Sequence, residues 1–250
     1  ERAQLVLDKI KGTKHQPVAY NSGDEAWKEV CERDDIDLIY ICTPWYLHTP
    51  MAVYAMNHGK HVVVEVPAAQ TLEECWQLVE TSEKTKLHCM ILENGCYGFF
   101  NLLVLNMVRQ GFFGEIIHTE GAYIHDIARS LFDRERRPGS WRLNENAHRN
   151  GNLYPTHGLG PIAQIMNLNR GDRMDYLISM SSNDFTLNNI AKELAAKDPS
   201  YARYVDNPFR GNMNVTTIRT VKGKTIMLQH DISSPRVYSY IHLISGTKAS

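Results

Sequence analysis

The chain has 250 residues, of which 43% are hydrophobic and 22% are charged, and its formal net charge is −1. This size predicts one or two globular domains with a substantial core. The balanced charge excludes both a basic nucleic-acid surface and a polybasic lipid-binding run. No apolar run reaches the roughly 18 residues of a membrane span. The cysteines are odd in number and form no CxxC pair, so we expect buried free thiols rather than a zinc site or disulfides: Cys31, Cys42, Cys75, Cys89 and Cys96.

The first part of the chain alternates strand and helix patterns. A helical stripe opens it, and the run IDLIYICTP is apolar throughout but short, as in a strand covered on both faces. Thr71, with Glu74 three residues on, is the predicted N-cap of a helix. Such alternation predicts a parallel sheet with helical crossovers. The predicted elements are strand 18–22, helix 24–33, strand 36–44, helix 49–59, strand 60–67, helix 71–85 and strand 87–94.

The pattern changes after residue 94. A helix is predicted to end at Gly111 or Gly114. Residues 126–150 are polar and irregular and predict a long loop. Gly223 marks a hairpin turn between two strands. We therefore predict two domains, 1–94 and 95–250, the second on a largely antiparallel open sheet. Its predicted elements are helix 99–114, strand 115–126, a turn and helix over 151–169, and strands 176–183, 213–221, 224–233 and 238–246.

Two motifs follow successive buried strands, where ligands bind in doubly wound folds. TPWYLH ends in His48, and GKHVVVEVPAA carries Glu65. Each motif alone also fits an ordinary strand–helix turn or a helix cap. Together, with about a dozen residues between them, they are much more specific.

Three further groups of polar and aromatic residues are candidates for a site. Tyr154 and His157 lie three apart at a turn entering a helix, and histidine titrates near neutral pH. Tyr123 and His125, two apart on a strand, share one face. The alternatives are a structural histidine in a Pro/Gly-rich turn and an exposed strand face. Trp141 and Arg142 on the long loop can contact a sugar or anchor the loop, and Tyr238 on a strand can instead belong to the core.

TPWYLHTPMAVYAMNHGKHVVVEVPAA resembles the signature of the Gfo/Idh/MocA oxidoreductase family. The resemblance covers essentially the whole chain. It implies an N-terminal Rossmann domain, with its first strand missing here, and a C-terminal α/β domain that carries the substrate site. The opening run ERAQLVLDKIK has the pattern of the middle of a helix, and the closing run IHLISGTKAS stops just after a strand pattern, so we expect the chain to be truncated at both ends. The family's glycine-rich loop would precede this chain. The sequence therefore does not indicate whether the protein has a targeting segment. The family's Glu-Lys-Pro motif reads Glu65-Val66-Pro67 here. In the family the lysine transfers the proton of the alcohol that is oxidised, which a valine cannot do.

The runs EGAYIHD, SWRL, GNLYPTHGLGP and SPRVYSYIHLISGTK are similar to glycoside hydrolase family 109, the NAD-dependent α-N-acetylgalactosaminidases. This resemblance implies transient oxidation of the sugar at C3, elimination at C1 and C2, and water addition, with no net oxidation. His157 would be the base or acid, assisted by Tyr154, Tyr123 or His125. The implied NAD contacts are Trp45, Tyr46, Leu47, His48, Glu65, Val66 and Asn94, and the implied sugar contacts are Tyr123, Trp141, Arg142, Tyr154, Pro155, Thr156, His157 and Tyr238.

Two alternatives stay open at this point. One is a sugar dehydrogenase of the same fold, against which Val66 argues. The other is a sugar- or nucleotide-binding protein without catalysis, against which the tyrosine and histidine set argues. The expected partner is a small-molecule or glycan substrate, with homo-oligomers as an option, and no nucleic acid or metal. By family resemblance, we expect a bacterial periplasmic or cell-surface location.

Overall fold

The computed structural model describes residues 2–135 and 141–250, and the chain divides into two compact units, 1–92 and 93–250. This division lies two residues before the boundary that the sequence predicts.

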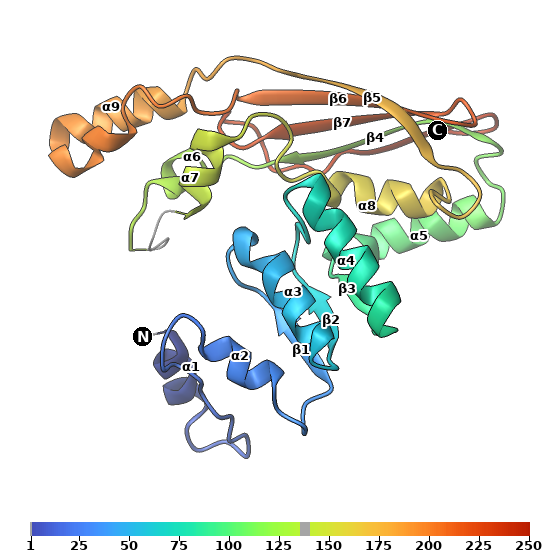
Figure 1. The fold of residues 1–250 in the computed structure, drawn as a ribbon. Coiled ribbons are helices and arrows are strands. Elements are labelled where there is room, and N and C mark those ends of the chain that lie inside the picture. Colours follow the sequence, from blue (N-terminus) through green and yellow to red (C-terminus); the bar gives the residue numbers. More distant parts are fainter. Residues whose placement is uncertain (1, 136–140) are drawn as a thin grey trace. The chain divides into compact units, whose positions relative to one another are not determined.

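Unit 1 contains a three-stranded parallel sheet in the order β1-β2-β3. Helix α3 packs on β1 and β2, and α4 packs on α3 and β3 (Figure 1). The capping box at the start of α4 is confirmed, because Thr71 accepts from the Glu74 amide and the Glu74 carboxylate accepts from the Thr71 amide. The elements are α1 (Arg2–Ile10), α2 (Ala26–Cys31), β1 (Leu38–Ile41), η1 (Trp45–Leu47), α3 (His48–Asn57), β2 (His61–Val64), α4 (Leu72–Thr85) and β3 (Cys89–Ile91).

Unit 2 contains a five-stranded sheet in the order β5-β6-β7-β4-β8, in which β4 and β7 are the parallel pair and all other neighbours are antiparallel. The predicted α/β architecture, a parallel sheet followed by a largely antiparallel one, is thereby confirmed. Gly223, at φ +83°, occupies the predicted hairpin turn between β6 and β7. The elements are η2 (Asn94–Tyr97), α5 (Phe99–Arg109), β4 (Ile116–Ile124), α6 (Ala128–Leu131), α7 (Trp141–His148), α8 (Thr156–Ile165), β5 (Met174–Ser181), α9 (Leu187–Lys197), η3 (Pro199–Tyr204), β6 (Met213–Thr220), β7 (Thr225–Asp231) and β8 (His242–Gly246).

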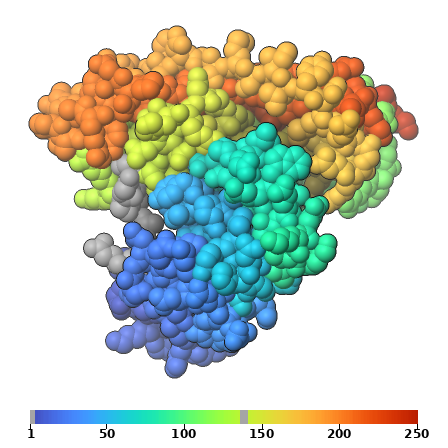
Figure 2. All heavy atoms as spheres, viewed as in Figure 1, coloured from blue at the N-terminus to red at the C-terminus, as the bar shows by residue number. Residues whose placement is uncertain are grey.

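Helices α5 and α8 cover one face of the second sheet (Figure 1) and bury the main core of this unit with apolar residues of β4, β6, β7 and β8. A second core joins α6, α7, α9 and η3. The edge strand β5 contributes little to either core, because seven of its eight residues are exposed. Figure 2 shows this segment, in golden orange, on the outer surface of unit 2.

Three sequence predictions about elements are wrong: the strand at 18–22, the loop at 126–150 and the strand at Tyr238. Residues 18–22 form no strand, and Val18 is 70% exposed, so this segment has no buried face. The predicted loop 126–150 contains α6 and α7 on either side of residues 136–140, which lie outside the described residues. Leu131, Leu143 and Ala147 are sparse among polar residues, yet all three are buried in the second core and stabilise these short helices.

Tyr238 was predicted on a strand, but β8 begins only at His242. The chain is interrupted at Ile241, whose φ of +44° is not that of a strand. Ser239 forms an isolated bridge to β4, at Ile124. Tyr238 is therefore half-exposed beside the end of β4 rather than part of a core.

Candidate functional site

The centre of the site in unit 2 is a buried pair of Glu93 and His157. The Oε1 atom of Glu93 lies 2.7 Å from Nδ1 of His157 and accepts a second hydrogen bond from the amide of Gly95 at 2.9 Å. Glu93 is 5% exposed and His157 is 7% exposed. Glu93 is the N-cap of η2, and His157 is the second residue of α8. Sequence reasoning identified His157 but missed Glu93, whose position after a strand was the available signal.

Two glycines allow this pair to form. A Cβ on Gly158 would meet the amide nitrogen of Ala122 at 2.7 Å, so only glycine lets α8 pack this closely on β4. A Cβ on Gly160 would meet Cγ of Glu93 at 2.7 Å. The GLGP run that follows His157 therefore brings the helix against both the strand and the carboxylate.

The electrostatics of the pair favour an ionised carboxylate. Burial opposes ionisation of Glu93, but the hydrogen bond and charge of His157, with the amide of Gly95, outweigh it and hold the pKa of Glu93 below its ordinary value. An ionised carboxylate only accepts, so Nδ1 of His157 carries the proton. In the neutral ring the lone pair is then on Nε2, which suits a base.

Aromatic rings surround His157. The ring centroid of Tyr154 lies 4.7 Å from that of His157, and the ring of Tyr123 lies 5.0 Å from Tyr154 and 5.3 Å from His157. The hydroxyl of Tyr123 lies 2.9 Å from Nδ1 of His125. The end of β4 and the start of α8 thus bring the two predicted Tyr/His pairs into one cluster.

Tyr240 belongs to the same cluster and was missed by sequence reasoning. Its ring centroid lies 5.4 Å from that of His157 and 5.1 Å from that of Tyr238. Burial, followed by the hydrogen bond with Tyr238, raises the pKa of Tyr240 well above its ordinary value. Tyr238 itself lies 4.8 Å from the ring of His125. The available signal was the spacing of two residues in VYSY, which would place both tyrosines on one face of the strand predicted there.

The remaining predicted sugar contacts lie on α7 and at the start of α8. Trp141 and Arg142 are the first residues of α7, not of a loop. The Arg142 guanidinium lies 5.1 Å from the ring centroid of Trp141 and 5.7 Å from that of Tyr154, so it reaches the aromatic cluster. Pro155 is the N-cap of α8 and Thr156 is its first residue.

In unit 1, the predicted cofactor residues lie after the carboxyl ends of β1 and β2. His48 is 1% exposed, and its ring nitrogens lie 2.8 Å from the carbonyl oxygen of Thr43 and 2.7 Å from that of Pro67. The ring therefore ties the loop after β1 to the loop after β2. Trp45 is also buried, Leu47 is partly buried, and Tyr46 is 51% exposed.

Glu65 directly follows β2, and its carboxylate accepts a hydrogen bond from the hydroxyl of Tyr40 at 2.6 Å. Val66 is buried at 4% exposure and has no group that titrates. Asn94, at the start of unit 2, is exposed. The two loops of unit 1 thus present a phenol at Tyr46 and a carboxylate at Glu65 as polar groups for a ligand.

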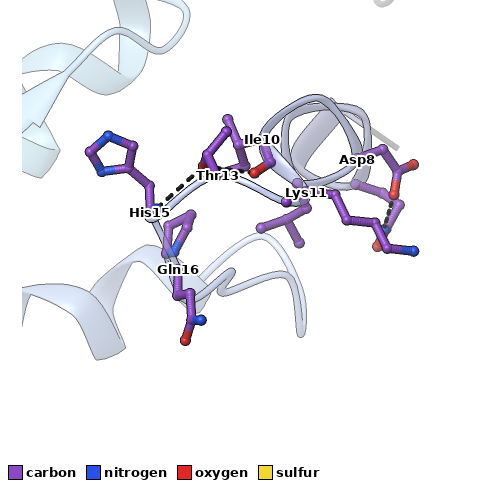
Figure 3. Close-up of a pocket in the computed structure, with 10 residues that line it drawn as sticks. Asp8, Ile10, Lys11, Thr13, His15 and Gln16 are labelled. Atoms are coloured by element: carbon purple, nitrogen blue, oxygen red, sulfur yellow. Dashed lines mark hydrogen bonds between the residues drawn. The ribbon is translucent and has the colours of Figure 1, made fainter.

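One depression on the surface of unit 1 lies apart from the predicted site residues. A depression formed by α1 and the loop after it, drawn in Figure 3 with Lys11, Thr13 and His15 labelled, contains none of the predicted site residues. Within residues 2–135 and 141–250, no cluster of three or more His, Cys, Asp and Glu is placed to hold a metal ion. Over the same residues, no helix combines the length and apolar character needed to cross a bilayer.

Comparison with solved structures shows the fold. Myo-inositol 2-dehydrogenase from Lactobacillus plantarum aligns over 100% of this chain and 65% of its own, with a TM-score of 0.68 at 18% identity. An inositol dehydrogenase homologue from Azotobacter vinelandii, complexed with NADH and myo-inositol, aligns over 89% of this chain and 52% of its own, with a TM-score of 0.62 at 18% identity. Residues 4–92 match the oxidoreductase family with an NAD-binding Rossmann fold, so unit 1 is of the class that binds nicotinamide cofactors.

Comparison of sequences shows the family. Residues 97–249 match the model of the glycosyl hydrolase 109 C-terminal domain. An alpha-N-acetylgalactosaminidase of Bacteroides fragilis is 53% identical over 236 residues, which are 93% of this chain and 55% of that protein. A glycosyl hydrolase family 109 protein of Solibacter usitatus is 51% identical over 99% of this chain and 56% of its own length. This chain spans about half the length of these relatives, and it belongs to glycoside hydrolase family 109.

Proposed function

We propose that the full-length protein hydrolyses terminal α-linked N-acetylgalactosamine with NAD as a catalytic cofactor. The observation that carries the proposal is the Glu93–His157 pair, buried at 2.7 Å inside a cluster of tyrosines. The 53% identity to an alpha-N-acetylgalactosaminidase supports the substrate class. Glu93 is buried, with Oε1 bound to His157 and Gly95 and Oε2 also buried, so we infer that this carboxylate acts through the histidine rather than as one of two carboxylates that flank a glycosidic bond.

The cofactor fits the chemistry of unit 1. The half-exposed phenol of Tyr46 and the carboxylate of Glu65, which can accept from ribose hydroxyls, lie in the loops after two parallel strands, where doubly wound folds bind nucleotides. We propose that Trp45, Tyr46, Leu47, His48, Glu65, Val66 and Asn94 form the NAD contacts, with His48 holding the two loops in place. Bound NAD supplies a reversible hydride acceptor at C3 of the sugar, which makes the proton at C2 acidic without net oxidation.

The residues of unit 2 then move protons and hold the sugar. His157 uses the lone pair on Nε2 as the base for the C2 proton, and Glu93 stabilises the resulting imidazolium. The hydroxyls of Tyr123 and Tyr154 can donate to sugar oxygens, with His125 behind Tyr123 at 2.9 Å. Arg142, whose guanidinium lies 5.7 Å from the ring centroid of Tyr154 and 5.1 Å from that of Trp141, would contact the sugar together with Trp141.

The test uses the full-length protein on a chromogenic α-N-acetylgalactosaminide in heavy water. We expect deuterium at C2 of the released sugar with no net NADH, because the C2 proton exchanges with solvent during elimination. We expect His157→Ala to lose turnover while NAD remains bound. Near-normal activity of that variant would remove His157 from the mechanism, and hydrolysis without deuterium would indicate direct displacement.

The same assay separates the alternative functions. A sugar dehydrogenase would produce net NADH from free sugars, and the dehydrogenases of similar fold give this reading its support. Val66 argues against it, because a buried valine cannot carry the proton of an alcohol. A binding protein would hold NAD and sugar without turnover. Export to the bacterial periplasm or cell surface and homo-oligomerisation stay predictions, which cell fractionation and light scattering of the full-length protein can test.

A further inference from the structure

His230 is a buried histidine that the proposed mechanism does not use. It lies on β7, directly opposite Tyr123 in the parallel β4–β7 pair, and its side chain is almost fully buried. Its ring centroid lies 6.0 Å from that of Tyr123. Its Nδ1 atom accepts a hydrogen bond from the amide of Leu153 at 3.3 Å. Leu153 directly precedes Tyr154, so this bond reaches the turn that carries the aromatic and histidine groups of the site.

The segment 146–153, which leads into this turn, is hydrogen-bonded at two further points. The amide of Arg210 donates to the carbonyl oxygen of Asn146 at 2.8 Å, and the amide of Gly211 donates to Oδ1 of Asn150 at 3.2 Å. The Nη2 atom of Arg210 donates to the carbonyl oxygen of His230 at 3.3 Å. Residues 146–153 are therefore attached at three points to β7 and the segment 210–211, and the side chain of His230 makes the attachment nearest to Tyr154.

The attachment requires an unprotonated Nδ1. Burial, and then the positive charge of Arg210, hold the pKa of His230 well below its ordinary value, although the carbonyl of Gly151 acts in the opposite direction. The ring is therefore neutral near pH 7. A protonated ring would donate from both nitrogens and would oppose the amide of Leu153 with a second donor.

We propose that His230 is a positioning residue of the active site, which fixes the Leu153 amide and thereby the places of Tyr154 and His157. This inference rests on the proposed function for its kinetic test. Its geometric content is independent of the substrate, because it concerns only the order of the segment before α8. Catalysis depends steeply on such placement, since a displacement of about 1 Å can lower a rate by roughly a hundredfold.

The test compares His230→Asn with His230→Leu in the full-length protein. Asn and Leu have similar shapes, but only Asn places an acceptor at the δ position that Nδ1 occupies. We expect the Leu variant to lose roughly tenfold or more in kcat, and the Asn variant to stay within about threefold of wild type. Both variants should bind NAD with unchanged affinity. Hydrogen exchange should show faster amide exchange across residues 150–157 in the Leu variant alone.

Equal kcat in the two variants, or equal exchange across residues 150–157, would overturn the proposal. If the Leu variant fails to fold, His230→Gln replaces it, since Gln moves the acceptor one bond further along the side chain. The two hypotheses fail separately. A wild-type protein that is inactive on α-N-acetylgalactosaminides refutes the proposed function, whereas the exchange experiment still decides the role of His230.

Discussion

Replacement of Glu93 by glutamine tests the charge of the buried carboxylate while keeping its shape. Glu93 accepts from Nδ1 of His157 at 2.7 Å and from the amide of Gly95 at 2.9 Å. A hydrogen bond to a charged group contributes about 1.5–3 kcal/mol, against about 0.5–1.5 kcal/mol for a neutral one. The difference between the two hydrogen bonds, about 1–2 kcal/mol, corresponds to a factor of roughly 5–30 in a rate or equilibrium constant. We expect Glu93→Gln to lower kcat on the glycoside by this factor, because the imidazolium of His157 loses its counter-charge.

The same variant changes how stability depends on pH. The folded-state pKa of Glu93 lies below its ordinary value of 4.5, so its ionised form stabilises the fold above that pH, and this contribution is lost as pH falls through the folded-state pKa. Because burial opposes the ionised form, we expect Glu93→Gln to lower the free energy of unfolding at pH 7 by about 1 kcal/mol, the low end of the range given above. Urea unfolding at several pH values should show that the difference from wild type is constant near neutrality and shrinks below about pH 4.5.

Glu120→Gln is the matched control for this experiment. Glu120 lies on β4, and its Oε1 atom lies 3.6 Å from Nε2 of His118, which makes a second Glu–His pair in unit 2. We expect this variant to have wild-type kcat, since neither residue contacts the aromatic cluster of the site in the described hydrogen bonds and ring contacts. Wild-type kcat in a folded Glu93→Gln variant would refute the role given to the carboxylate.

Two further predictions concern the walls of the site. Tyr123→Phe keeps the ring contacts with Tyr154 and His157 but removes the hydroxyl that lies 2.9 Å from Nδ1 of His125, so kcat should fall by roughly tenfold or more. The control is Tyr201→Phe, which removes a hydroxyl that donates to the Phe132 carbonyl and should leave kcat normal. Equal kcat in the two variants would show that the Tyr123 hydroxyl takes no part in the reaction. Gly158→Ala forces a Cβ to within 2.7 Å of the Ala122 amide nitrogen and should lower the free energy of unfolding by about 1–3 kcal/mol. An unchanged midpoint of urea unfolding would contradict this prediction.

Local sequence patterns were enough to predict most of the helices and strands of the chain. The apolar runs that became β1 and β2, the Thr71 capping box and the Gly223 turn each depend on neighbours within a few residues. The motif residues His157, Tyr154 and Tyr123 were also identified from the sequence, and the structure places them in contact. The short helices α6 and α7 escaped prediction, because their few buried residues become a stripe only against α9.

What only the tertiary structure decided is which distant groups meet. Glu93 and His157 are 64 residues apart and form a pair because glycines at 158 and 160 let α8 approach β4 and Glu93. Tyr240 joins the cluster because the segment before β8 pairs with the end of β4. His230 reaches the Leu153 amide, 77 residues away in sequence, from the neighbouring strand β7. Periodicity encodes which face of an element is buried, whereas the partner across that face is set by packing of the whole unit.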